Sequence, residues 1–146
     1  MSRRKAREIV LCLVFEKDYH RDCDCEKLYN DLFEENQFND NENENELTDI
    51  NEADEDYIKS TFFGVYKNIE QIDDIVSNST IGWEYNRISK ISMALLRIAV
   101  YEILFADDIP TSVAINEAVE LSKRYDDFEA YTFINGVLGA VVKNHK

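Results

Sequence analysis

The chain has 146 residues and a formal net charge of −14, with only four glycines, one proline and three cysteines. One domain of this length buries about two-thirds of its unfolded surface without metals or disulfides. Scarce glycine and proline leave little material for hairpin turns, so the composition disfavours β-sandwiches and barrels and favours an all-α fold. The sequence also lacks a glycine-rich loop that could hold a phosphate group.

The first predicted helix begins after Ser2, a residue type that favours helix N-cap positions, and it ends near Tyr19. Its apolar residues recur at helical spacing and form one stripe. The stripe consists of Ala6, Ile9, Val10, Leu13 and Val14. We also expect Cys12, in the same apolar run, to be a small core residue.

A second helix is predicted over residues 25–35. The side chains that it is expected to bury are Leu28, Leu32 and Phe33. At about residues 37–51, Asn and Glu alternate without an amphipathic period, which predicts a disordered or mobile acidic loop. Residues 40–56 hold nine acids and no base, so the remainder carries 21 acids against 16 bases. Outside this segment the chain is therefore only mildly acidic.

Two more helices are predicted before the middle of the chain. The third begins at Asn51 or Asp54, and Gly64 within it indicates close packing against another helix. Its packing positions are Tyr57, Ile58, Thr61, Phe62 and Val65. The fourth covers residues 68–77. Its buried face is expected to consist of Ile69, Ile72, Ile75 and Val76.

The fifth predicted helix, residues 89–106, is apolar around nearly its whole circumference at 3.6 residues per turn. A helix of this kind is surrounded by other helices. It is about long enough to span a membrane. Its charged residues, which include Arg97 and Glu102, and its polar flanks instead indicate a central core helix in a protein without membrane association.

Two further helices complete the chain. The first is capped by Thr111 or Ser112. Its packing positions are Val113, Ala114, Ile115, Ala118, Val119, Leu121 and Tyr125. Asp126 and Asp127 place negative charge at the start of the last helix. The last helix buries Ile134, Val137, Leu138 and Val141. The sequence thus predicts an all-α fold, with about seven helices in two small helical bundles around a shared, buried central helix, as a single domain over residues 1–146.

Groups suited to catalysis or metal binding are sparse. Only His20 and His145 could act as unperturbed bases near neutral pH, and no nucleophile–base arrangement can be proposed from the spacing. Cys23 and Cys25 have the wrong spacing for a zinc knuckle and no fourth ligand nearby. We therefore expect no catalysis, no metal and no cofactor, and the three free cysteines indicate a reducing cytoplasm.

Four bases, Arg3, Arg4, Lys5 and Arg7, occupy the first turns of the first predicted helix. A helix N-terminus adds exposed N–H groups and about half a positive charge, so together they form an anion site suited to a phosphate backbone. The alternative is a solvated helix start that pairs with Glu8 or with the acidic loop. The net charge does not decide between them, because charges farther away than about 8 Å are largely screened at physiological salt.

Four segments carry a resemblance to a known family: SRRKAREIV (residues 2–10), LLRIAVYEI (95–103), IPTSVAINEAVELSKRY (109–125) and FINGVL (133–138). Weaker agreement at Gly64, Asp73 and Trp83 extends the similarity over nearly the full length. In these segments the chain resembles the NusB family of bacterial transcription antitermination factors. The resemblance implies an all-α fold with two helical subdomains and no catalysed reaction.

The resemblance also implies partners. The family binds the boxA element of ribosomal-RNA leader transcripts together with NusE, a ribosomal protein of the small subunit, and joins an antitermination complex on RNA polymerase. The matching positions here are, for RNA, Arg3, Arg4, Lys5, Arg7 and Phe133 and, for NusE, Phe15 and Arg97.

Some of these positions have a second interpretation. Phe133 could be one more core phenylalanine, and Arg97 could form an intramolecular salt bridge on its buried helix. The chain also departs from the family: Phe15 replaces the usual tyrosine, Thr132 replaces a common base, and residues 126–129 are more acidic than usual. The last two departures predict weaker RNA binding.

Two functional hypotheses therefore stand side by side. The first is the RNA-binding antitermination factor, and the second is a helical protein-interaction module that uses the same fold without specific RNA binding. The oligomeric state stays open as well, since some relatives pair through the partner-binding face. The surfaces of Phe15 and Arg97 could form a homodimer in the same way.

Overall fold

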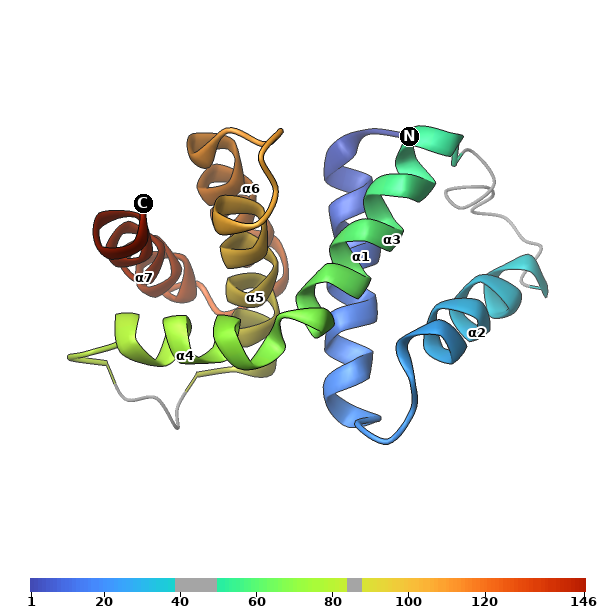
Figure 1. The fold of residues 1–146 in the computed structure, drawn as a ribbon, viewed down its shortest axis with the longest axis horizontal. Coiled ribbons are helices and arrows are strands. Elements are labelled where there is room, and N and C mark those ends of the chain that lie inside the picture. Colours follow the sequence, from blue (N-terminus) through green and yellow to red (C-terminus); the bar gives the residue numbers. More distant parts are fainter. Residues whose placement is uncertain (39–49, 84–87) are drawn as a thin grey trace. The chain divides into compact units, whose positions relative to one another are not determined.

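The computed structural model describes residues 1–38, 50–83 and 88–146, with the backbone alone for residues 33–38. Seven helices and no strand occur within these ranges, which confirms the all-α fold (Figure 1). The helices are α1 (Arg3–Tyr19), α2 (Cys25–Phe38), α3 (Glu52–Lys67), α4 (Ile69–Ser79), α5 (Lys90–Leu104), α6 (Thr111–Tyr125) and α7 (Ala130–His145). None of the helices in the described ranges combines the length and hydropathy needed to cross a membrane.

The chain divides into two compact units, Met1–Phe63 and Gly64–Lys146. The first contains α1, α2 and most of α3, and the second contains the end of α3 and the four remaining helices. The central helix α5 lies wholly in the second unit, and α3 is the helix that runs from one unit into the other. The acidic loop predicted at about residues 37–51 lies mostly outside the described residues, but Gln37 and Phe38 belong to α2.

In the first unit, α1 has the predicted bounds. The Ser2 hydroxyl accepts a hydrogen bond from the Lys5 amide at 3.1 Å and caps the helix. Four members of the apolar stripe are fully buried, whereas Ile9 is half-buried. The prediction for Cys12 is wrong, because its side chain is exposed on α1.

The other two helices of this unit differ in how well the sequence predicted them. In α2 the buried side chain is Tyr29, while the expected Leu28 and Leu32 are only half-buried. The start of α3 is fixed by reciprocal hydrogen bonds: the Asp54 amide donates to the Asn51 side chain at 2.8 Å, and the Asn51 amide donates to the Asp54 carboxylate at 3.4 Å. Such reciprocal capping satisfies two amides that the helix itself cannot bond.

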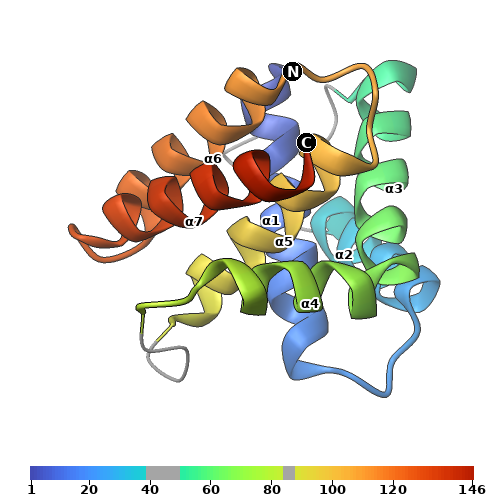
Figure 2. The same ribbon diagram turned by 60° about the vertical axis from the view of Figure 1, so that its left-hand side comes forward.

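In the second unit, α5 packs against α4, α6 and α7 (Figure 2). Nine of its fifteen residues are buried, which confirms that it is the core helix. Gly64 at the end of α3 allows a close approach to the Tyr101 ring of α5. A Cβ atom at Gly64 would lie 2.3 Å from a ring carbon, so the predicted close packing is confirmed.

Three details around α6 and α7 differ from the prediction. The N-cap of α6 is Pro110, which has no side chain able to cap, and Val113 and Tyr125 are exposed. The last helix begins only at Ala130, so Asp126 does not lie in its first turn. Instead the Asp126 carboxylate accepts hydrogen bonds from both hydroxyls in the capping turn of α5, those of Ser89 and Ser92. The interaction joins the end of α6 to the start of α5.

Candidate nucleic-acid interface

The start of α1 presents basic side chains next to a helix N-terminus. Arg3 and Arg4 are exposed, and Lys5 is half-buried. No acidic residue occurs in the first turn of the helix. Backbone N–H groups at a helix N-terminus attract anions, and guanidinium groups bind phosphate in a bidentate manner. This basic turn, defined as Arg3, Arg4 and Lys5, therefore combines two contributions that favour a phosphate.

Two arginines of α1 contact the same aromatic ring of α3. The guanidinium carbon of Arg3 lies 4.4 Å from the centroid of the Tyr57 ring, and that of Arg7 lies 5.4 Å from it. Both distances lie within the range of cation–π attraction. The two arginines differ in exposure, since Arg3 is exposed and Arg7 is only 3% exposed.

The burial of Arg7 corrects its place in the predicted patch. Arg7 was one of the four bases predicted to contact RNA, but a residue that is only 3% exposed has almost no surface to offer to an RNA phosphate. Lys5 also has a partner within the helix, because its Nζ atom lies 3.1 Å from a carboxylate oxygen of Glu8. The pairing with Glu8 considered from the sequence is thus present for Lys5. Arg3 and Arg4 are the exposed members of the basic turn.

Phe133 lies in the second unit, on α7, and forms part of a different surface. Its ring meets the ring of Trp83 edge-to-face, with centroids 5.0 Å apart. The two rings line a pocket together with Phe128. The carboxylates that line this pocket are Asp126, Asp127 and Glu129, and its described lining includes no base. The pocket offers aromatic faces for stacking but an unfavourable potential for phosphate.

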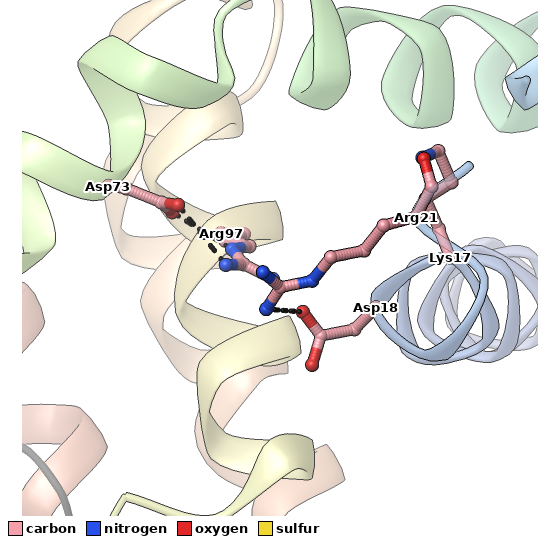
Figure 3. Close-up of polar contacts among 5 residues, drawn as sticks. All are labelled: Lys17, Asp18, Arg21, Asp73 and Arg97. Carbon is pink, nitrogen blue, oxygen red and sulfur yellow. Dashed lines mark hydrogen bonds and ion pairs between the residues drawn. The ribbon is translucent and has the colours of Figure 1, made fainter. Parts of the chain in front are cut away.

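The two positions matched to NusE contacts lie in different units. Phe15, on α1, is half-buried and packs against Tyr19, with ring centroids 5.2 Å apart. Arg97, on α5, donates hydrogen bonds from Nε and Nη2 to the two carboxylate oxygens of Asp73, at 2.9 and 3.1 Å (Figure 3). The salt bridge considered from the sequence is therefore present.

Figure 3 also shows a polar turn at the end of α1 in the first unit. The Lys17 ammonium donates to the backbone carbonyl of Arg21 at 2.9 Å, and the Arg21 guanidinium lies 3.5 Å from the Asp18 carboxylate. The lysine thereby satisfies a carbonyl just beyond the helix C-terminus, a common role for a base at that end.

Sequence reasoning missed the contribution of Tyr57 to the basic turn. Tyr57 was correctly expected to be buried, but helical spacing indicates only that a residue faces the core and not what it meets there. Its two arginine contacts join positions fifty or more residues apart, which no local pattern reports. Asp73, the partner of Arg97, had a weak signal in the sequence, namely its agreement with the family pattern.

The fold and the basic turn define a small all-α protein whose first helix begins with exposed basic side chains. The sequence profile of the NusB family matches residues 4–143. The transcription antitermination protein NusB of Acetivibrio thermocellus is 43% identical over 143 residues, which is 98% of this chain and 90% of the relative.

Solved structures give the same result. NusB of T. maritima has a TM-score of 0.82 at 30% identity, over 99% of this chain and 93% of that chain. A NusB chain crystallised with NusE and dsRNA has a TM-score of 0.79 at 24% identity, over 98% of this chain and 97% of that chain. The chain belongs to the NusB family of transcription antitermination proteins.

Proposed function

We propose that this protein is a non-catalytic, RNA-binding transcription antitermination factor that binds boxA RNA of ribosomal-RNA operon transcripts together with NusE. The observation that carries the proposal is the basic turn, with two exposed arginines at the capped start of α1 in a member of the NusB family. A structurally similar NusB was crystallised with NusE and dsRNA, which supports both partners.

The basic turn explains how a protein with a net charge of −14 binds RNA. Only charges within about 8 Å of a phosphate act on it strongly at physiological salt. The remaining acids lower the long-range attraction and leave the local contact intact. We therefore expect modest affinity with a steep salt dependence, and we expect NusE to raise the affinity by adding contacts.

Phe133 is proposed as a second contact, with a base and not with a phosphate. Its aromatic neighbours suit stacking, which contributes about 1–3 kcal/mol per base. The carboxylates beside it make a phosphate contact there unfavourable.

Phe15 and Arg97 are proposed to face NusE. Phe15 offers a half-buried ring for packing. The side chain of Arg97 is only 11% exposed in its pair with Asp73, whose side chain is 34% exposed. A partner that contacts the Arg97–Asp73 salt bridge would therefore touch mainly the side chain of Asp73, the more exposed of the two. A second copy of the chain could use the same surface, so a homodimer would compete with NusE.

The wider role follows from the family. We propose that the protein acts in the cytoplasm and joins the antitermination complex on RNA polymerase through its RNA and NusE contacts. The alternative is an interaction module that binds NusE without specific RNA recognition, and the pairing of Lys5 with Glu8 favours it because it reduces the exposed positive charge.

One titration separates the two functions. Fluorescence anisotropy is measured with a boxA-type RNA and with a scrambled RNA of equal composition, with and without NusE. The antitermination factor binds boxA more tightly than the scrambled RNA, and NusE widens the difference. Equal, weak binding of both RNAs in the presence of bound NusE would establish the interaction module instead.

A further inference from the structure

Tyr57 contributes to the basic turn from another helix. It is 7% exposed and lies on the second turn of α3, which is held in place by the reciprocal Asn51–Asp54 cap and by the fully buried Ile58. The core around the ring thus restricts the positions that it can take. Arg3 lies 4.4 Å from the ring centroid and Arg7 lies 5.4 Å from it.

A ring restricted in this way changes what it costs Arg3 to bind a phosphate. An exposed arginine has many rotamers and loses most of that freedom when its guanidinium is held by a ligand. A guanidinium already attracted to a ring samples fewer rotamers in the unbound protein, so it loses less on binding. Arg3 is exposed, so a phosphate can still reach it.

Arg7 has the opposite relation to the same ring. It is only 3% exposed, and the Tyr57 ring is one of the groups that its guanidinium contacts. Arg7 therefore supports the contact between α1 and α3 and does not reach a ligand. The two arginines thus contact the same ring, but Arg3 is exposed to solvent and Arg7 is buried.

We propose that Tyr57 is a positioning residue for RNA binding. Its ring holds the Arg3 guanidinium in an orientation that can bind a phosphate. The buried Arg7 contacts the same ring and stabilises the packing of α1 against α3. The inference rests on the proposed function, because it assumes that Arg3 contacts RNA. It adds a residue of α3 to a surface otherwise made by α1 alone.

The test is a double-mutant cycle measured as RNA affinity of the full chain. The variants are Tyr57→Leu, Arg3→Gln and both together, with Tyr57→Phe as the conservative control and a boxA-type RNA as the probe. Tyr57→Leu removes the ring and is expected to weaken binding about two- to fivefold. Tyr57→Phe keeps the ring and is expected to bind like the wild type.

The cycle distinguishes positioning from a general structural role. In the Arg3→Gln background, Tyr57→Leu is expected to cause no further loss, since the group that the ring holds is gone. A loss of equal size in both backgrounds, or an equal loss in Tyr57→Phe, would overturn the inference. If the wild type itself does not bind the RNA, the proposed function fails, and that result is distinct from failure of the positioning role.

A second measurement covers the case in which Tyr57→Leu does not fold. In the NMR spectrum of the free wild type, the Cδ protons of Arg3 are expected to be shifted upfield by the ring current of Tyr57. Resonances at ordinary arginine positions would show that the ring does not hold the side chain, and would overturn the inference.

Discussion

The basic turn in the first unit and the Phe133 pocket in the second were both predicted to contact RNA, but their chemistry differs. The basic turn has exposed guanidiniums at a helix N-terminus and no acid in the first turn. The pocket has three aromatic rings among three carboxylates. The comparison indicates that one surface suits the phosphate backbone and the other suits an unstacked base, so their responses to salt should differ.

The largest effect is expected for Phe133→Ala. Loss of the stacking ring is expected to weaken binding of a boxA-type RNA by about 1–3 kcal/mol, because one base loses its aromatic partner. The slope of log affinity against log salt should stay unchanged, since no phosphate contact is lost. Ile81→Ala is the control, because Ile81 is a large apolar side chain of the second unit that is 85% exposed and does not line the pocket. A lower slope for Phe133→Ala would show that the pocket does contact phosphate.

Two glycines probe how tightly the scaffold of the second unit is packed. Gly64→Ala is expected to lower the free energy of unfolding by about 1–3 kcal/mol, because the new Cβ atom would lie 2.3 Å from the Tyr101 ring, which must move. Gly139→Ala has no atom within 4 Å of the new Cβ and is expected to raise stability by up to about 1 kcal/mol, as alanine favours a helix. Urea denaturation measures both. Equal shifts in the same direction would contradict the close packing at Gly64.

The Arg97–Asp73 pair is expected to have a smaller effect on stability. Asp73→Asn removes the charge that receives two hydrogen bonds from Arg97 and is expected to cost about 1–2 kcal/mol. Asp31→Asn is the control, because the Lys27–Asp31 pair is exposed and should contribute less than about 1 kcal/mol. Thermal unfolding of the two variants measures both losses of stability. A larger loss of stability for Asp31→Asn than for Asp73→Asn would contradict the prediction.

The smallest effect at neutral pH concerns Tyr29 in the first unit. Burial, with a smaller contribution from Glu55, raises the pKa of the Tyr29 hydroxyl to about 12. In the unfolded chain the Tyr29 hydroxyl ionises near pH 10. The contribution of the neutral, buried hydroxyl to the free energy of unfolding is therefore complete below pH 10 and is lost as the pH rises toward 12. Absorbance at alkaline pH should show a late-titrating component that is smaller in Tyr29→Phe than in the wild type. An unchanged titration curve in that variant would refute the assignment.

The sequence predicted the helices well, because each depends on local patterns. The apolar circumference of α5, the Ser2 cap and the Asn51 start of α3 are all properties of neighbouring residues. Apart from the N-cap of α6, which is Pro110 and not Thr111 or Ser112, the errors concern tertiary contacts. Cys12 was assigned to the core from its apolar neighbours, and Asp126 was assigned to the wrong helix, because its partners on α5 lie more than thirty residues away.

The candidate site shows the same division. Clustered bases predicted the basic turn, and the family pattern added Phe133, Phe15 and Arg97. Helical spacing could not show that Arg7 is buried. Spacing of three or four residues indicates which side chains share a face of one helix, but not which other helix packs against that face. The difference in exposure between Arg3 or Arg4 and Arg7 depends on tertiary neighbours such as Tyr57, which lies on another helix.

The central claim is that Arg3 and Arg4 bind RNA phosphates in spite of the acidic total charge. The most direct measurement is the salt dependence of RNA affinity for Arg3→Gln with Arg4→Gln. The control is Lys27→Gln with Lys59→Gln, which removes two exposed charges elsewhere in the first unit. Loss of two single-strand contacts lowers the magnitude of the slope by about 1.4. We expect that decrease in the arginine variant and not in the control, and an unchanged slope in the arginine variant would contradict the account.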